Sequence, residues 1–336
     1  MAMIQQLVGH EDVRAHLRNA LASGKISQAY LFAGEEGSGR RTLAKRFAMA
    51  LNCTGEGEKP CMQCESCRKA LGQNHPDIIT VQHEKPKVIR IDEIRDQILQ
   101  TVDILPYESP KKVYLIPDAD KMNPNAQNAL LKTIEEPPSY AVFLLIASGE
   151  EALLPTIRSR CVKLHVKPLP DDVIEEYLMT QLHVPDYEAK IAAAAAQGNI
   201  GRARAAIEDE KFGEITADTL RVIRQVQNLS TQEFIEIIKQ LKDEKENVSV
   251  YLDLMQLWFR DVLLYKATAD ANLVVFKQEL STIREQASGS SYEGLQKIMD
   301  ALENAKTRLR ANVSFELTME LLFLTIRENC QGSYKK

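Results

Sequence analysis

AYLFAGEEGSGRRTLAKRFAMAL, residues 29–51, is the stretch that decides the fold. It opens with an apolar run typical of a buried strand, continues through a glycine-rich centre, and ends in a helical pattern. The centre, GEEGSGRRT at 34–42, has the spacing of a phosphate-binding loop, in which Gly, four residues and Gly precede Lys and then Ser or Thr. Arg40 stands in the place of the Lys and Arg41 in the place of the hydroxyl residue. The stretch therefore predicts a strand, a phosphate loop with altered chemistry, and a helix.

The two substitutions affect different parts of phosphate chemistry. The missing Lys is the group that reaches the β- and γ-phosphates, and the missing hydroxyl is a ligand of Mg²⁺. Arg40 keeps the positive charge but is longer and planar, Arg41 cannot bind a metal, and Thr42 lies one place too late. We therefore expect a degenerate loop that holds no ATP and Mg²⁺, or that binds nucleotide weakly without hydrolysis. Its residues are Gly34, Gly37, Gly39, Arg40, Arg41 and Thr42.

A second part of the same machinery is also altered. An active phosphate-loop ATPase carries Asp, commonly followed by Glu, at the end of a later strand, where the two hold Mg²⁺ and activate water. The strand expected at 112–116 is followed by Pro117, Asp118 and Ala119. Pro117 then stands where the Asp is expected and Asp118 where the Glu is expected. If Asp118 is instead the metal ligand, Ala119 replaces the base, so one acidic group is missing in either register. We expect no ATP hydrolysis by this chain.

Strand-like and helical runs alternate over the first half of the chain. We read strands in four apolar runs, at 29–34, 77–81, 112–116 and 142–148. Helical patterns lie between them, which predicts an α/β domain with a parallel sheet covered by helices. After Val166 the composition becomes helical. The expected domains are an α/β domain at 1–166, a small helical domain at 167–207, and a larger all-helical domain at 208–336.

A cluster of cysteines follows the first helix of the α/β domain. CTGEGEKPCMQCESC, residues 53–67, places Cys53, Cys61, Cys64 and Cys67 at C-x7-C-x2-C-x2-C. Four thiolates at this spacing can close a tetrahedral shell around a structural Zn²⁺ and leave no position for a catalytic water. An iron–sulfur cluster also takes four Cys, although its surroundings are usually more apolar than this stretch. Disulfides are the third alternative and are disfavoured in a reducing cytosol. We expect a zinc module at 53–67.

The overall composition is that of a globular protein. Among 336 residues, 42 Lys and Arg stand against 47 Asp and Glu, so the net charge is −5, which argues against a uniformly basic nucleic-acid-binding surface. Apolar runs such as AVFLLIA at 141–147 are too short to span a bilayer. The first residues, MAMIQQLVGHEDV, lack the pattern of a secretory signal. The expected location is the cytoplasm.

Several of these stretches together resemble the clamp-loader branch of the AAA+ family. QAYLFAGEEGSGRRTLAKRFA at 28–48 is similar to the family's entry into the P-loop, and the four-Cys insertion follows the first helix as it does in family members. Four further stretches are similar to family motifs in the same order: HPDI (75–78), IRIDEIRDQI (89–98), NALLKTIEEPP (128–138) and the triplet Ser159, Arg160, Cys161. The resemblance is strong up to about residue 207 and weaker beyond. It implies a RecA-like AAA+ domain, then a helical lid, then an all-α collar that holds subunits together.

The resemblance also implies a role and partners. In clamp loaders the arginine of the Ser-Arg-Cys triplet acts as an arginine finger in the ATP site of the adjacent subunit, and Arg160 matches it. The implied partners are the gamma/tau and delta subunits of the bacterial DNA polymerase III clamp loader, and through them the sliding clamp and primed DNA. The holoenzyme as a whole is a DNA-directed DNA polymerase.

Two residues and two rival functions stay open at this point. Ser148 matches a polar sensor position but could equally be a strand-end hydroxyl, and Gly201 holds the place of the family's lid arginine, with Arg202 one position later. An active gamma/tau-type ATPase is one rival, against which Arg40, Arg41 and Pro117 argue. A zinc-dependent nucleic-acid adaptor is the other, against which the acidic balance and the lack of aromatic residues among the cysteines argue.

Overall fold

The structure is a computed structural model that describes residues 7–84, 88–226, 231–243 and 247–330. The chain divides into two compact units. Unit 1 comprises the residues up to Val173 together with Asn199–Gly201, and unit 2 comprises Ile174–Gly198 together with the residues from Arg202 onward.

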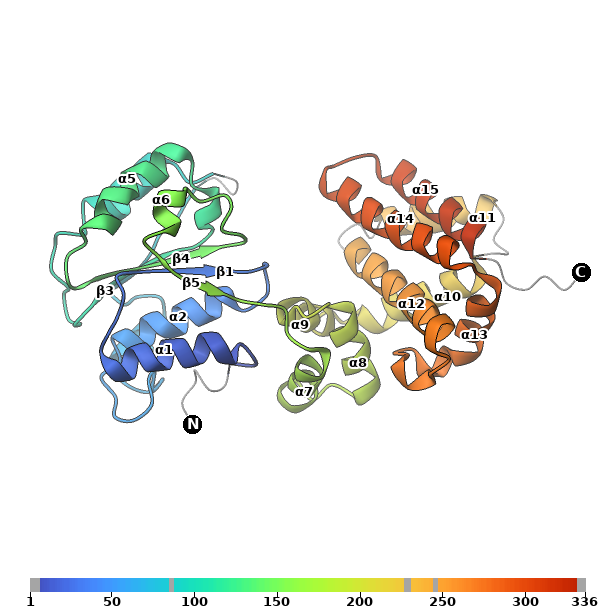
Figure 1. Cartoon of the computed structure of the whole chain (residues 1–336), viewed down its shortest axis with the longest axis horizontal. Coiled ribbons are helices and arrows are strands. Elements are labelled where there is room, and N and C mark those ends of the chain that lie inside the picture. Colours follow the sequence, from blue (N-terminus) through green and yellow to red (C-terminus); the bar gives the residue numbers. More distant parts are fainter. Residues whose placement is uncertain (1–6, 85–87, 227–230, 244–246, 331–336) are drawn as a thin grey trace, which may run out of the picture. The chain divides into compact units, whose positions relative to one another are not determined.

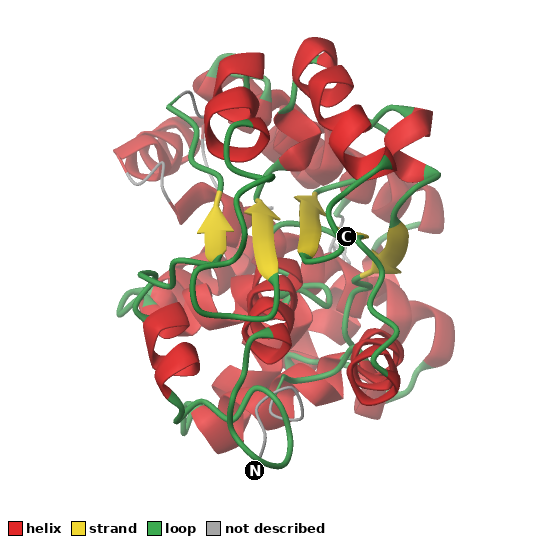
Figure 2. Ribbon diagram, turned by 90° about the vertical axis from the view of Figure 1, so that its left-hand side faces the viewer, coloured by secondary structure: helices red, strands yellow, loops and turns green. Residues whose placement is uncertain are grey.

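Unit 1 is built on a five-stranded sheet with the order β2-β3-β4-β1-β5. All its pairings are parallel, and β1 lies between β4 and β5. The expected parallel sheet is therefore confirmed, and Figure 2 shows its strands between layers of helices. The strands are β1 Ala29–Ala33, β2 Ile78–Thr80, β3 Lys112–Ile116, β4 Ala141–Ala147 and β5 Val162–His165.

Two apolar layers cover the two faces of the sheet because successive side chains of a strand point to opposite sides. Tyr30 and Phe32 of β1 pack with Leu43 and Phe47 of the following helix. Leu31 of β1 belongs to the other layer, with β3, β4 and the helix after β3. Figure 1 shows α1 and α2 on one side of the sheet and α5 and α6 on the other. The helices of unit 1 are α1 Glu11–Ser23, α2 Arg40–Leu51, α3 Glu65–Leu71, α4 Ile91–Ile94, α5 Pro124–Glu135 and α6 Pro155–Arg158, with a π-helical turn at Arg95–Leu99.

The regular elements in the described residues of unit 2 are all helices. Trp258 of α12 is fully buried, and its indole N–H donates to Gln286 Oε1 at 2.8 Å. The helix α14 packs along both α12 and α15. Two helices have their first residues in unit 1, α7 Asp171–Gln181 and α9 Ile200–Glu208. The others are α8 Asp186–Ala195, α10 Phe212–Gln225, α11 Thr231–Asp243, α12 Val248–Thr268, α13 Leu280–Gly289, α14 Tyr292–Arg310 and α15 Phe315–Asn329.

The structure adds one strand to those expected. The strand β5 pairs with β1 from Val162 to His165, yet two of its four residues, Lys163 and His165, are exposed. An edge strand with polar exposed positions has no apolar run by which the sequence could reveal it. The boundaries of the lid at 167–207 and the collar at 208–336 stay a prediction. None of the helices in the described ranges has the length and apolar character needed to cross a membrane.

A buried carboxylate fastens the loop that leads into β3. Asp77 lies just before β2 and is almost fully buried. Its Oδ1 accepts the backbone N–H of Tyr107, and its Oδ2 accepts those of Glu108 and Ser109, both at 2.9 Å. Hydrogen bonds to a charged acceptor are stronger than neutral ones, so this residue ties three consecutive peptide groups to the edge of the sheet.

We predict that Asp77→Ala destabilises the chain. The substitution leaves three N–H groups without their acceptor and should lower the free energy of unfolding by about 2–4 kcal/mol. Urea unfolding of the full chain, followed by circular dichroism, measures the change. Asp92→Ala is the control, because Asp92 is an exposed carboxylate paired with Arg95 at 3.2 Å and should cost less than about 1 kcal/mol. Equal losses for the two variants would contradict this role of Asp77.

Candidate functional site

The glycine-rich loop joins β1 to α2 at the carboxyl edge of the sheet. Gly37 and Gly39 have φ angles of 87° and 96°, the left-handed region that favours glycine. A Cβ on Gly34 would lie 2.6 Å from the backbone oxygen of Val166, so this position also excludes a side chain. The loop runs directly into the first turn of α2, where Thr42 is exposed. The expected strand, loop and helix are all present.

Arg40 is buried inside the loop that it was expected to line. The residue is 4% exposed, and its Nη1 donates to the carbonyl oxygen of Gly34. Its Nη2 lies 3.9 Å from Oδ1 of Asp118. Burial lowers the pKa of the guanidinium, although Asp120 and Asp118 counteract part of that effect. Arg40 therefore places a positive charge within the loop and spans it from the helix to the end of β1.

Arg41 is paired with the carboxylate that follows β3. Its Nη2 lies 2.6 Å from Oδ1 of Asp118, which is 9% exposed. Lys121 and His83 approach the other oxygen of Asp118 at 3.4 Å and 3.6 Å. Burial by itself would raise the pKa of Asp118, but the hydrogen bond and charge of Arg41, aided by Lys121, outweigh it and lower the pKa. The carboxylate is therefore ionised and lies among basic side chains.

A second carboxylate of the same turn contacts the end of β4. Ser148 donates its hydroxyl to Oδ2 of Asp120 and its backbone N–H to Oδ1 at 3.3 Å. Ser148 is exposed, and the sequence had left its role open between a sensor and a strand-end hydroxyl. This hydroxyl is hydrogen-bonded to Asp120, which lies two residues after Asp118, the carboxylate that pairs with Arg41.

Residues remote from the loop in sequence close over it, and sequence reasoning did not predict these contacts. The side chain of Asn199 donates to the backbone oxygen of Glu36 at 2.7 Å, and the N–H of Gly201 donates to the oxygen of Gly37 at 2.9 Å. A Cβ on Gly201 would lie 2.7 Å from Gly37, so the close approach requires glycine here. His10 contacts the oxygen of Ser38 through Nε2 at 2.9 Å. The sequence analysis singled out Gly201 and Arg202 in the segment GNIGRAR at 198–204. Asn199 of the same segment is the polar residue that could have indicated a contact with the loop.

The four cysteines between α2 and α3 come together. Their sulfur atoms, of Cys53, Cys61, Cys64 and Cys67, all lie within 4.8 Å of one another. The N–H groups of Cys61, Cys64 and Cys67 donate to the sulfurs of Cys53, Cys61 and Cys64 at 3.3–3.4 Å. Burial would raise the pKa of the Cys64 thiol, but the N–H of Cys67 and contacts with Thr54 outweigh it and bring the pKa to about 5. The N–H group therefore favours the thiolate, the form that binds a metal, at Cys64, whereas burial raises the pKa of Cys53 and Cys67.

Neighbouring polar groups fix this cysteine cluster to the sheet. Asn52, just before Cys53, donates to the oxygen of Lys111 at 2.9 Å and accepts its N–H at 3.2 Å. Ser66 donates its hydroxyl to the oxygen of Asn52 at 2.8 Å and contacts His75 Nε2 at 3.1 Å. A Cβ on Gly55 would lie 2.5 Å from the Cys61 sulfur. The cluster therefore has a defined geometry that suits four-coordinate metal binding.

Arg160 follows α6 and lies on the surface of unit 1. Its Nη2 is 2.8 Å from Oε1 of Glu135 at the end of α5, and its Nη1 donates to the oxygen of Thr156 at 3.1 Å. Its side chain is 39% exposed and that of Glu135 is 41% exposed. The next residue, Cys161, is largely covered, and burial raises the pKa of its thiol to about 12. Arg160 thus presents a charged, partly exposed head group beside the NALLKTIEEPP helix.

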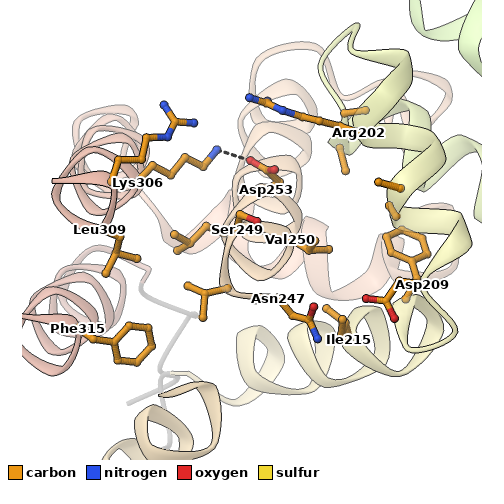
Figure 3. Close-up of a pocket in the computed structure, with 18 of the residues that line it drawn as sticks. Arg202, Asp209, Ile215, Asn247, Ser249, Val250, Asp253, Lys306, Leu309 and Phe315 are labelled. Carbon is orange, nitrogen blue, oxygen red and sulfur yellow. Dashed lines mark ion pairs between the residues drawn. The ribbon is translucent and has the colours of Figure 1, made fainter. Parts of the chain in front are cut away.

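Arg202 lines a cavity of about 930 Å³ in unit 2 (Figure 3). The ion pair of Lys306 with Asp253, at 2.7 Å, lies on the same cavity. The remaining walls include apolar side chains such as Ile215 and Leu309. Arg202 therefore forms part of the wall of this cavity. The preceding residue, Gly201, belongs to unit 1 and contacts the glycine-rich loop there.

These arrangements define what the glycine-rich loop can do chemically. The position of the metal-binding hydroxyl carries Arg41, and the acidic group after β3 is paired with that arginine. The loop keeps positive charge and backbone N–H groups, which attract phosphate, but it lacks the hydroxyl and the free carboxylate that hold Mg²⁺.

The chain matches known protein families over most of its length. The family described as "DNA polymerase III, delta subunit" matches residues 9–170, and the one described as "DNA polymerase III, delta subunit, C terminal" matches residues 217–328. DNA polymerase III subunit delta' of Bacillus subtilis is 31% identical over 317 residues, which cover 93% of this chain and 94% of that protein.

Two further similarities are more distant or partial. DNA polymerase III subunit tau of Bacillus subtilis is 28% identical over 354 residues, 98% of this chain and 62% of that protein. The solved structure of a DNA polymerase III gamma subunit-related protein from Thermotoga maritima has a TM-score of 0.46 at 21% identity, covering 94% of this chain and 99% of that one.

The delta' relative is matched over 94% of its length, whereas the tau relative is matched over 62% of its length. The resemblance to AAA+ clamp loaders noted in the sequence is thereby confirmed. This chain belongs to the clamp-loader family of DNA polymerase III subunits, in the branch that contains the delta-prime subunit.

Proposed function

We propose that this chain is a delta-prime-type clamp-loader subunit that does not hydrolyse ATP itself. It works in the cytoplasm within the DNA polymerase III holoenzyme, together with gamma/tau and delta subunits. The complex opens the sliding clamp and loads it on primed DNA. The all-helical C-terminal region holds the complex together, and Arg160 acts on the ATP bound by a neighbouring gamma/tau subunit.

The ion pair between Arg41 and Asp118 is the observation that carries the proposal. Hydrolysis by a phosphate-loop ATPase needs a hydroxyl and a carboxylate on Mg²⁺ and a base for water. The guanidinium of Arg41 takes the hydroxyl's place and lies 2.6 Å from the one acidic group at 117–118. The residues at the two Mg²⁺-binding positions, Arg41 and Asp118, are therefore paired with each other. This pairing supports a subunit that assembles into the complex and assists a neighbouring ATPase without hydrolysing ATP itself.

The surroundings of Arg160 support a role as an arginine finger. A guanidinium is planar, permanently charged and able to bind phosphate oxygens with two N–H groups. Its present partner, Glu135, is a partly exposed carboxylate. Exposed ion pairs of this kind contribute no more than about 1 kcal/mol. A triphosphate presented by an adjacent subunit carries more negative charge than one carboxylate, so Arg160 can exchange Glu135 for it.

The cysteine cluster supports a structural zinc ion. Four sulfur atoms within 4.8 Å of one another match the tetrahedral Cys₄ shell that zinc takes in structural sites. All four positions are thiols, so no coordination position is left for water and catalysis by the metal is not expected. Cys53, Cys61, Cys64 and Cys67 would hold the ion, and its part is to stabilise the insertion between α2 and α3.

An active gamma/tau-type ATPase is the alternative, favoured by the tau match over 98% of this chain. The two proposals differ in the ATP turnover of the isolated chain. We expect turnover at background level, since the loop lacks the Lys and the hydroxyl. Turnover above background that disappears in Arg40→Ala would favour the alternative.

We predict that the purified chain holds about one zinc ion and that Cys64→Ser releases it. Elemental analysis measures the metal, and chelator treatment should lower the melting temperature of the parent chain. Cys161→Ser is the matched control, because that cysteine lies outside the cluster, and it should retain the full zinc content. Iron in place of zinc, or a folded chain prepared without chelator that contains no metal, would refute the assignment.

We predict that Arg160→Ala leaves the reconstituted clamp loader assembled but slows clamp-stimulated ATP hydrolysis and clamp loading. Loss of a finger removes charge stabilisation of the transition state at one ATP site, on the order of 10³-fold there, diluted by the sites that remain intact. Size-exclusion chromatography checks assembly, and steady-state hydrolysis checks the rate.

Arg95→Ala is the matched control for this experiment. Arg95 is also a partly exposed arginine paired with a carboxylate, Asp92, at 3.2 Å. The control should hydrolyse ATP and load clamps like the parent complex. Normal loading with Arg160→Ala, combined with failed loading with Arg40→Ala, would reverse the roles assigned to the two arginines.

A further inference from the structure

The loop that leads into β3 has an exposed apolar tip on a fastened backbone. Among the described residues, Ile104, Leu105 and Tyr107 have the most exposed large apolar side chains, at 61%, 71% and 87%. Before the tip ends, Lys112 Nζ donates to the oxygen of Ile104 at 3.0 Å. After it, three consecutive N–H groups, beginning with that of Tyr107, donate to the buried carboxylate of Asp77. The backbone of the loop is therefore held on both sides of the tip.

His75 connects Asp77 to the helix that follows the cysteines. The N–H of Asp77 donates to Nδ1 of His75 at 3.1 Å, so Nδ1 is the nitrogen without a proton. Burial lowers the pKa of His75, so at neutral pH the ring is neutral and its single proton is on Nε2. That nitrogen lies 3.1 Å from the hydroxyl of Ser66 on α3 and 3.3 Å from the hydroxyl of Ser109 in the loop. The ring therefore joins α3 to the loop.

The hydroxyl of Ser66 joins the two arms of the cysteine cluster. Ser66 lies between Cys64 and Cys67 in the sequence and is buried. Its hydroxyl donates to the oxygen of Asn52, the residue before Cys53, at 2.8 Å. The same hydroxyl contacts the histidine ring, so both arms of the cluster are connected to the loop through it.

The helix α3 depends on the cysteine cluster for its position. It has seven residues, fewer than the roughly 12–15 that an isolated helix needs. Its apolar packing is a small cluster whose buried members are Met49, Cys53 and Cys67. A metal on the four thiolates would cross-link the two arms and hold the helix between them. From that position Lys69 of α3 reaches Glu108 of the loop at 2.7 Å, a second contact beside the histidine.

We propose that the metal-loaded cysteine cluster holds the loop at 104–109 in place, through the chain of contacts from Ser66 to His75 to Asp77. The metal then acts beyond the insertion between α2 and α3, on a surface loop in front of β3. Loss of the metal releases α3, weakens its contacts with the loop and lets the loop open while the sheet stays folded. The inference rests on the structural zinc proposed above and is independent of the glycine-rich loop and of the arginine finger.

Hydrogen–deuterium exchange of the full chain, followed by mass spectrometry, tests the proposal with zinc present and after its removal by chelator. The peptide that covers 104–111 should exchange at least about tenfold faster without zinc, whereas the peptide that covers β4 should change by less than about twofold. Equal exchange of the loop in the two samples would overturn the proposal. Equal acceleration of loop and strand would also overturn it, because the metal would then stabilise the whole domain.

Elemental analysis of the same samples separates this inference from the zinc assignment. A folded chain prepared without chelator that contains no metal would refute the assignment, and the inference with it. A chain that contains zinc, but whose loop exchanges equally with and without the ion, would refute the inference alone.

Ser66→Ala tests the chain of contacts with the metal in place. Because its side chain is not a metal ligand, the variant should keep its full zinc content, yet its loop should exchange about fivefold faster, the effect of one lost hydrogen bond. Ser23→Ala is the matched control, since its hydroxyl also donates to a backbone oxygen, that of Asn19 at 2.7 Å, but in α1 and outside the cluster. The control should exchange like the parent chain. A zinc-loaded Ser66→Ala chain whose loop exchanges at the parent rate would contradict the inference.

Discussion

The parallel pairing of β1 with β4 and β5 is the constraint on which the site depends. Parallel strands bring their carboxyl ends to the same edge of a sheet, so the loop after β1, the turn after β3 and the end of β4 meet there. This edge brings Arg40 and Arg41 to Asp118, and Asp120 to Ser148. A hydrogen bond from Gly34 N–H to the oxygen of Ala147 fixes the start of the loop to β4 at 3.2 Å.

The loop keeps its backbone form while its chemistry has changed. Gly37 and Gly39 adopt the left-handed angles of a tight turn, and this backbone requirement is independent of the side chains that follow. The arginines occupy the positions of the lysine and the hydroxyl and pair with Asp118, and Asn199 and Gly201 close the loop from outside. Under the proposed function, the subunit keeps the architecture of an ATPase and the surface that presents Arg160 without using the metal chemistry itself.

The local parts of the structure could be predicted from sequence, and the distant contacts could not. The apolar runs of β1, β3 and β4 and the spacing of the four cysteines carry their own signal, because burial and metal binding each require a residue pattern within a short stretch. In the strand β5, Lys163 and His165 are exposed, so no apolar run marks it in the sequence and its pairing with β1 defines it as a strand. The contacts of Asn199 with the loop and of Arg160 with Glu135 join residues remote in sequence, and no local pattern encodes them.

The central claim is that a guanidinium has replaced the metal at this loop. Crystals of the full chain soaked with ATP and Mn²⁺, as a substitute for Mg²⁺ that scatters anomalously, test it most directly. The account predicts that Arg41 stays on Asp118 and that no anomalous peak appears beside that carboxylate, whether or not phosphate occupies the loop. A manganese peak bound to Asp118, with the Arg41 side chain displaced from it, would contradict the account.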